Sequence, residues 1–167
     1  GVERYIVEGG GLTGIQILPD DEVEIINNEG NQICEISAFN KDGKSELSIL
    51  GLKETKDNSE IKKILFKKDE TSLQALLQLK KRNLNIEKSK SSLVFDKNTK
   101  AGESVKLKSK DKCYCIFAAP GKEMIVHEQN PSTELTVIVK RSIVKKDKEF
   151  SIIPDPVYDP SNEINIA

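Results

Sequence analysis

The chain has 167 residues, enough for one domain that buries roughly two thirds of its unfolded surface. Its 26 basic residues nearly balance its 27 acidic residues, and the net charge of -1 argues against nucleic acid as a partner. Three cysteines, an odd number, indicate a reducing compartment, and the absence of an apolar run near ~18 residues argues against a membrane span. We therefore expect a cytoplasmic protein with neither a nucleic-acid nor a membrane partner.

Alternating or β-branched segments separated by Gly, Pro, Asn and Asp predict a mainly β domain. The predicted strands are 5–7, 15–17, 23–25, 32–39, 105–107, 113–118 and 134–140. Turn residues at 18–21 and 27–30 separate the second, third and fourth strands, which predicts a meander over the first forty residues. Residues 41–57 are polar and contain two glycines, so they are expected to form a loop with a short strand at 48–52.

The segment that follows Gly30 alternates between two faces, and neither face is purely apolar. Gln32 and Cys34 lie on one face, and Glu35 lies on the other. A strand of this kind is either an edge strand or one wall of a pocket. In the second case Gln32, Glu35 and Asn40 are the candidate ligand-pocket residues, as polar groups in an otherwise apolar wall.

Two helices are expected to flank the sheet, at about residues 58–66 and 71–83. Thr71 and Gln74 have the spacing of a capping box, which places the start of the second helix at Thr71. The predicted apolar stripe of this helix consists of Leu73, Leu76, Leu77 and Leu84. The fold class that follows is an antiparallel β-sandwich or distorted barrel with one or two flanking helices.

Candidate chemistry is confined to a few side chains. Cys34, Cys113, Cys115 and His127 together offer three sulfurs and one nitrogen, a set that zinc accepts. The spacing lacks a two-residue knuckle turn, and small cysteines buried in a β core explain the same pattern. His127 is expected at the mouth of a loop, where a lone surface histidine is the ordinary interpretation. A Ser-His-Asp triad and a phosphate loop are both without support in the sequence.

Several short sequence motifs follow one another in the order that is typical of one known family. These motifs are residues 8–11, 15–26, 30–32, 38–40, 101–107, 111–113, 118–120 and 130–137. This order resembles the urea carboxylase-associated domain family, a β-rich fold found alone and as a module. Some members of that family are metal-dependent enzymes that act on small C–N compounds. Residues 45–55 contain none of the cysteine and histidine typical of those enzymes, and Ala119 stands where a cysteine is expected. Cys113 remains in a matching place.

These departures resemble the N-terminal module of an aminomethyltransferase related to the glycine cleavage T-protein. The resemblance implies a non-catalytic accessory or docking domain at 1–153, followed by an extended Pro-rich linker at 154–167 toward a missing downstream domain. No cofactor is then expected in this domain, and tetrahydrofolate is expected in the parent protein. The implied partners are downstream domains of the same polypeptide, with a homo-oligomer possible.

Two other functions stay open at this point. The first is a metal-dependent amidine or C–N hydrolase that uses the three cysteines and His127. The second is a small-ligand binding module whose pocket contains Gln32, Glu35 and Asn40.

Overall fold

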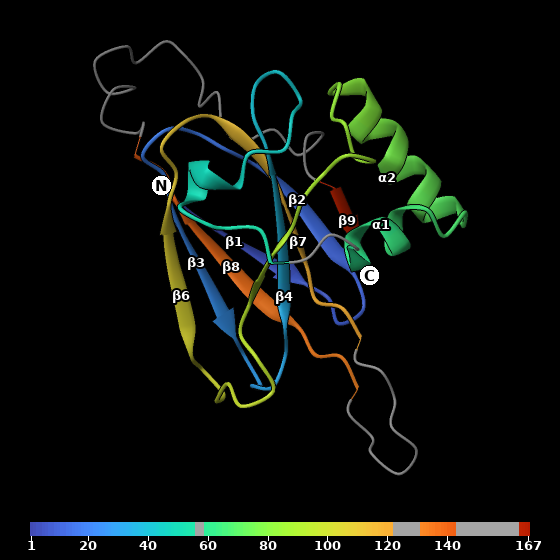
Figure 1. The fold of residues 1–167 in the computed structure, drawn as a ribbon. Coiled ribbons are helices and arrows are strands. Elements are labelled where there is room, and N and C mark those ends of the chain that lie inside the picture. The colour runs from blue at the N-terminus through green and yellow to red at the C-terminus, as the bar shows by residue number, and fades with distance from the viewer. Residues whose placement is uncertain (56–58, 122–130, 143–163) are drawn as a thin grey trace.

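The fold consists of two antiparallel sheets packed face to face, seen in a computed structural model that describes residues 1–55, 59–121, 131–142 and 164–167 (Figure 1). The first sheet has the order β1 (Val2–Val7), β8 (Leu135–Lys140), β3 (Glu22–Asn27) and β6 (Ser104–Lys108). The second sheet has the order β5 (Ser92–Val94), β4 (Cys34–Phe39), β7 (Cys113–Ala118), β2 (Leu12–Ile17) and β9 (Ile164–Ile166). The predicted β-sandwich is confirmed.

The first four strands alternate between the two sheets, so the meander predicted over the first forty residues is wrong. Strand β1 pairs with β8, whereas β2 pairs with β7 and β9. The turn between β2 and β3 forms as expected, with the Asp21 carboxylate accepting the Leu18 N–H at 2.9 Å. Such a turn reverses the direction of the chain but leaves open which sheet the next strand joins.

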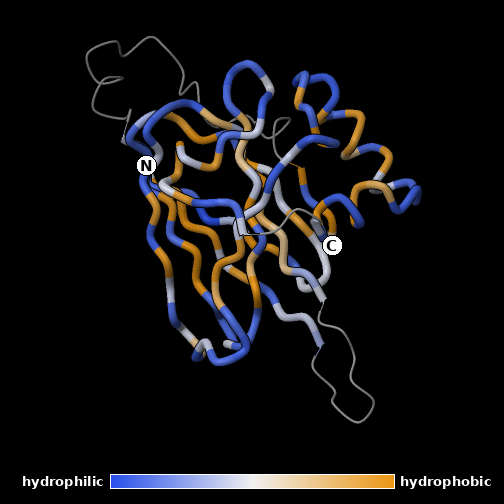
Figure 2. The backbone as a smooth tube through the Cα atoms, viewed as in Figure 1, coloured by the Kyte–Doolittle hydropathy of each residue, from blue (hydrophilic) through white to orange (hydrophobic). Residues whose placement is uncertain are grey.

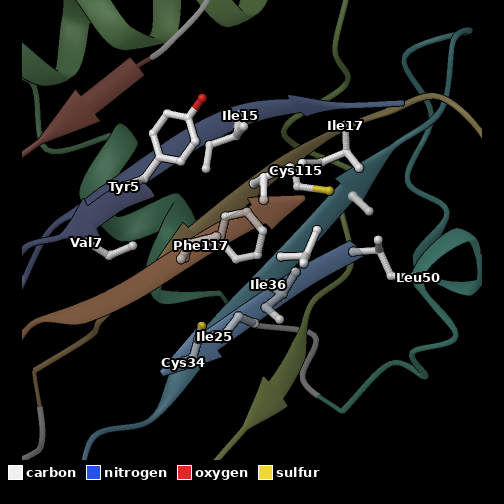
Figure 3. Packing of buried hydrophobic residues seen from close by; sticks show 14 of the residues in the cluster. Tyr5, Val7, Ile15, Ile17, Ile25, Cys34, Ile36, Leu50, Cys115 and Phe117 are labelled. Atoms are coloured by element: carbon white, nitrogen blue, oxygen red, sulfur yellow. The ribbon is translucent and has the colours of Figure 1, made fainter. Parts of the chain in front are cut away.

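The main core lies between the two sheets and is built from alternate residues of both. The second sheet contributes Ile15 and Ile17 of β2 and Phe117 of β7, and the first sheet contributes Ile25 of β3 to the same cluster (Figure 3). Apolar segments accordingly follow the strands, whereas the connecting loops are mostly hydrophilic (Figure 2). Strands β4 and β7 are buried along their whole length because helices cover their outer face. This double burial positions the polar residues of β4 inside the protein.

Of the two interpretations that the sequence offers for β4, the edge strand is wrong, and only the last residue of the strand, Phe39, lines one of the pockets described below. Strand β4 lies between β5 and β7 and is an interior strand, not an edge strand. Its polar Glu35 and Ser37 face the helices, where each side chain has hydrogen-bond partners. The physical reason is that a buried carboxylate or hydroxyl is tolerated in a strand when neighbouring groups satisfy it.

Two helices, α1 (Glu60–Leu65) and α2 (Glu70–Lys81), confirm the predicted flanking pair. Both lie together on the outer face of the second sheet and form a second apolar cluster with it. None of the helices within the described ranges is long and apolar enough to span a membrane. The two helices close one side of the molecule and frame the cavities described below.

The predicted cap of α2 is wrong, and the predicted apolar stripe is only half right, because Leu76 and Leu84 pack in the second cluster but Leu73 and Leu77 do not. The helix is capped by Asp69, whose carboxylate accepts the Ser72 N–H at 2.8 Å, and not by Thr71. Leu73 and Leu77 of the predicted stripe are 47% and 59% exposed. The buried face instead contains Ser72, Ala75 and Leu79. These residues have the i, i+3, i+7 spacing of one helix face, and tertiary packing selected that face although the other carries more leucine.

Two further segments differ from expectation. Residues 48–52, predicted as a short strand, lie largely in a 3₁₀ helix, η1 (Leu47–Leu50), which ends at Gly51 with a φ of 71°. Within the predicted linker at 154–167, Ile164–Ile166 form β9 and pair with β2. The alternation of Ile164 and Ile166, both buried, explains this pairing. Residues 154–163 lie outside the described residues, and the domain boundary at 153 stays a prediction.

Candidate functional site

A pocket of about 190 Å³ lies at the end of the second sheet, where β4 ends and β7 begins. We call it the strand-end pocket. Its floor is a row of cross-strand neighbours on the face that the helices cover, because Tyr114 pairs with both Gln16 and Phe39. Arg82 and Leu84, which follow α2, form a wall. The pocket thus lies between the sheet and the C-terminal end of α2.

The walls of the strand-end pocket are held in place by short-range contacts. The guanidinium carbon of Arg82 lies 4.3 Å from the centroid of the Tyr114 ring, which is a cation–π contact. The Asn40 carboxamide oxygen accepts the N–H groups of Asp42 and Lys44 and so shapes the turn after β4. Gly43 in this turn approaches the segment after α2 so closely that a Cβ would lie 1.9 Å from the Asn83 carbonyl oxygen.

The charge of the strand-end pocket is one-sided. Lys41, Arg82 and Lys112 all line it, and Gln16 and Asn40 add two carboxamides. No aspartate or glutamate is among the described residues that line this cavity. The pocket therefore supplies hydrogen-bond donors and positive potential, which is the chemistry that binds a group with negative oxygen atoms.

The three predicted pocket residues do not share a cavity. Of Gln32, Glu35 and Asn40, the strand-end pocket is lined by Asn40 alone. The buried Gln32 carboxamide donates to the Pro120 carbonyl at 2.9 Å and accepts the Thr133 N–H at 2.8 Å, so it joins three loop segments. Gln32 and Asn40 are eight positions apart with β4 between them, a span of roughly 26 Å if the chain is extended.

Glu35 is fully buried and caps helix α1. Its carboxylate accepts the N–H of Glu60 at 3.0 Å and the N–H of Ile61 at 3.1 Å. The hydroxyl groups of Ser59 and Ser91 also donate to it. These donors satisfy the helix N-terminus and the buried charge together, so the arrangement accounts for this acidic residue structurally.

The three predicted sulfur ligands are also divided. The Sγ atoms of Cys113 and Cys115 lie 3.4 Å apart in the core between the sheets. Cys115 pairs with Ala38, whereas Cys34 lies four residues further along β4, about 13 Å away at the usual rise of a strand. His127 lies outside the described residues. Within the described ranges, no three His, Cys, Asp or Glu residues are grouped closely enough to hold a metal ion.

The buried thiols have shifted proton affinities. Burial, together with the charge of Glu35, raises the pKa of Cys34 well above its ordinary value. The hydrogen bond from the Cys115 thiol outweighs burial and lowers the pKa of Cys113. The same bond and burial raise the pKa of Cys115. All three side chains are buried, so none of them is placed to attack a molecule from solvent.

A buried ion cluster lies at one end of strands β1, β8 and β3 of the first sheet. Sequence reasoning did not find it. The Arg141 guanidinium, after β8, forms a bidentate pair with Glu3 of β1 at 2.7 and 2.9 Å. It also donates to the Asp21 carboxylate at 2.7 Å and to the Gln16 carbonyl at 2.9 Å. The Arg141 and Asp21 side chains are almost completely buried. This cluster is structural, because each charge is met by a neighbour of opposite charge.

A larger cavity, of about 350 Å³, lies beside α2. Its lining includes Phe66 after α1, Leu76 and Lys80 of α2, and the segment 83–87. Leu73 and Leu77 of α2 expose apolar surface but do not line it. This cavity has fewer charged residues than the strand-end pocket and is the less suitable of the two for a charged ligand.

Comparison with known proteins gives one informative match. No protein-family model matches the chain. A curated protein of Ruegeria pomeroyi named trimethylamine-oxide aldolase is 31% identical to it over 167 residues. The match covers 99% of this chain and 21% of that enzyme, so the chain spans about a fifth of the length of the relative.

This match overturns the predicted non-catalytic accessory domain of an aminomethyltransferase. The relative carries the name of an enzyme with a different activity, and the match gives no support to the urea carboxylase-associated or T-protein resemblance. The motifs behind that resemblance are turns and alternating strands, which many β domains share because they specify backbone geometry and not chemistry. The similarity to trimethylamine-oxide aldolase is therefore the stronger guide to function.

Proposed function

We propose that this chain is part of an enzyme related to trimethylamine-oxide aldolase and acts on a small tertiary amine oxide. The similarity to the Ruegeria pomeroyi enzyme carries the proposal, because it extends over 99% of the chain. Both sheets and both flanking helices fall within the matched length. The similarity thus concerns the whole folded unit and not one local motif.

The relative is much longer than the match, so we propose further domains of the same polypeptide as partners. Tetrahydrofolate stays a proposed cofactor of such a longer enzyme. A strand-end pocket of about 190 Å³ is too small for a ligand of that size, which favours a folate site elsewhere. The three unpaired cysteines support a cytoplasmic location, since thiols persist in a reducing compartment.

The test uses the longest natural polypeptide that contains this chain. Loss of the methyl proton resonance of trimethylamine N-oxide is followed by NMR, with and without tetrahydrofolate and divalent metal ions. We expect trimethylamine N-oxide to be consumed and trimethylamine, which lacks the oxygen, to be left unchanged. A folded protein that leaves the N-oxide unchanged under every one of these conditions would refute the proposal.

A pair of variants connects the activity to this chain. Arg141→Met removes the buried guanidinium between Glu3 and Asp21, whereas Arg4→Met removes an exposed arginine of β1. We expect thermal inactivation at a lower temperature in Arg141→Met and at an unchanged temperature in Arg4→Met. Equal inactivation temperatures in the two variants would show that the activity does not depend on the stability of this chain, which would contradict the proposal.

A further inference from the structure

We infer that helix α2 is a self-association surface, on which α2 of a second copy of this chain packs in the antiparallel direction. The surface consists of Glu70, Leu73, Leu77 and Lys80, and we call it the outer face of α2. All four side chains are exposed. They follow one another with the i, i+3, i+7, i+10 spacing that places residues on one face of a helix. The inference does not depend on the proposed activity.

The exposed apolar surface of the protein is concentrated at this helix. Of the large apolar residues that the structure describes, four are exposed, and three of them are Phe66, Leu73 and Leu77, in α2 or in the segment before it. The opposite face of α2 is already used, because Ser72, Ala75 and Leu79 are buried beneath it. Helix α2 lies at the edge of the molecule in Figure 1, so a second helix can approach it. Apolar surface gathered in this way is typical of a contact between proteins.

The outer face of α2 is complementary to itself. A two-fold axis at the level of Ala75 brings Leu73 opposite Leu77 of the second copy, because both residues are equally far from Ala75 along the helix. The same axis brings Glu70 opposite Lys80 of the second copy. Symmetry repeats each of these contacts, so an antiparallel pair has apolar contacts at its centre and an ion pair at either end.

Charge favours the antiparallel direction over the parallel one. Glu70 lies in the first turn of α2 and Lys80 in the last turn. Within the part of the chain that the structure describes, neither residue forms an ion pair in its own copy. Two parallel copies would place Glu70 against Glu70 and Lys80 against Lys80, which repel. Antiparallel helices also bring the positive end of one helix dipole beside the negative end of the other.

The size of the surface sets the strength of the association. One helix of 12 residues from each copy forms a contact smaller than the roughly 1,200 Å² of a stable interface. The cavity of about 350 Å³ beside α2 adds the apolar side chains of Phe66 and Leu76, on which leucines of the second copy can pack. We therefore expect a weak, reversible dimer with a dissociation constant between about 10 μM and about 1 mM.

The first experiment is sedimentation equilibrium of the chain between about 10 μM and about 1 mM. We expect a monomer–dimer equilibrium in the wild type. Leu77→Ser should raise the dissociation constant at least about tenfold, because symmetry removes the contact twice, whereas Val2→Ser, at an exposed apolar residue of β1, should leave it unchanged. A wild type that stays monomeric throughout would overturn the inference and leave the outer face of α2 to another domain of the polypeptide. An equal effect of Val2→Ser would overturn it as well.

A charge exchange tests the direction of the two helices. Glu70→Lys alone and Lys80→Glu alone each place like charges opposite one another, so each should weaken association about threefold or more. An equimolar mixture of these two variants should restore it, because every lysine then lies opposite a glutamate. Unchanged association in the single variants, or no recovery in the mixture, would refute antiparallel pairing. Circular dichroism of each variant separates a loss of association from a loss of fold, and the outcome is independent of the amine-oxide assay.

Discussion

Replacement of Arg141 by methionine tests the structural account of the buried ion cluster most directly. Methionine keeps much of the apolar volume but removes four hydrogen bonds, two to Glu3, one to Asp21 and one to the Gln16 carbonyl. Two carboxylates then lose their counter-charge in a site where Asp21 is fully buried. Removal of one partner of a buried ion pair costs about 3–5 kcal/mol, against a total stability of about 5–15 kcal/mol.

The assay is urea denaturation of the wild type, Arg141→Met and the exposed control Arg4→Met at neutral pH. The free energy of unfolding should fall by about 3–5 kcal/mol in Arg141→Met and by less than about 0.5 kcal/mol in Arg4→Met. A loss below about 1 kcal/mol in Arg141→Met would refute the reasoning, because the carboxylates would then be satisfied without the guanidinium.

The pH dependence gives a second test of the same cluster. Burial raises the pKa of Glu3, but its bonds with Arg141 and Tyr5 outweigh burial and hold the pKa below its ordinary 4.5. A carboxyl whose pKa is lowered on folding stabilises the protein above its unfolded pKa, and this contribution is lost as the pH falls through the folded pKa. The stability difference between wild type and Arg141→Met should therefore shrink below about pH 4.5. A constant difference down to pH 3 would contradict the assignment.

Three further predictions follow from other contacts. Glu35→Gln replaces a carboxylate that accepts two N–H groups at the N-terminus of α1 by a neutral amide. The free energy of unfolding, measured in urea, should fall by about 2–3 kcal/mol, whereas the exposed Glu54→Gln serves as a near-neutral control. Gly11→Ala places a Cβ 1.8 Å from the Ile166 carbonyl oxygen, so amide hydrogen exchange of β9 should accelerate while that of β7 stays slow. Buried Cys34, whose pKa is raised, should resist Ellman's reagent at pH 8 in the native protein and react fully in denaturant; rapid native labelling would contradict its burial.

The fold class could be predicted from sequence because it depends on short-range patterns. The alternation of apolar and polar residues at 23–25, for example, fixes which side chains face the core, and the apolar run at 113–118 is typical of a strand that is buried on both faces. The short strands β5 and β9, of three residues each, were missed, and β9 falls in the segment that was interpreted as a Pro-rich linker. The distribution of the strands between the two sheets was also missed, since a turn determines that the chain reverses direction but not which strand the next one pairs with.

The candidate site could not be predicted because its residues are far apart in the sequence. Lys41, Arg82 and Lys112 stand in three separate turns, and each one alone looks like an ordinary exposed lysine or arginine at the end of an element. Sequence reasoning instead selected Glu35, whose polar character in an apolar strand is explained by the cap of α1. A polar residue in a strand can serve a neighbouring helix, and a single segment does not reveal this.

Strand β2 has neighbours that are remote in the chain, and this has a consequence for how the protein folds. Leu12 lies opposite both Ala118 of β7 and Ile166 of β9. Domains dominated by such distant pairings fold slowly, on a scale of about milliseconds to seconds, because long loops must close before the contacts form. During that interval the apolar edge of β2 is open to other unfolded chains, so conditions that slow encounter between chains should favour the yield of native protein on refolding.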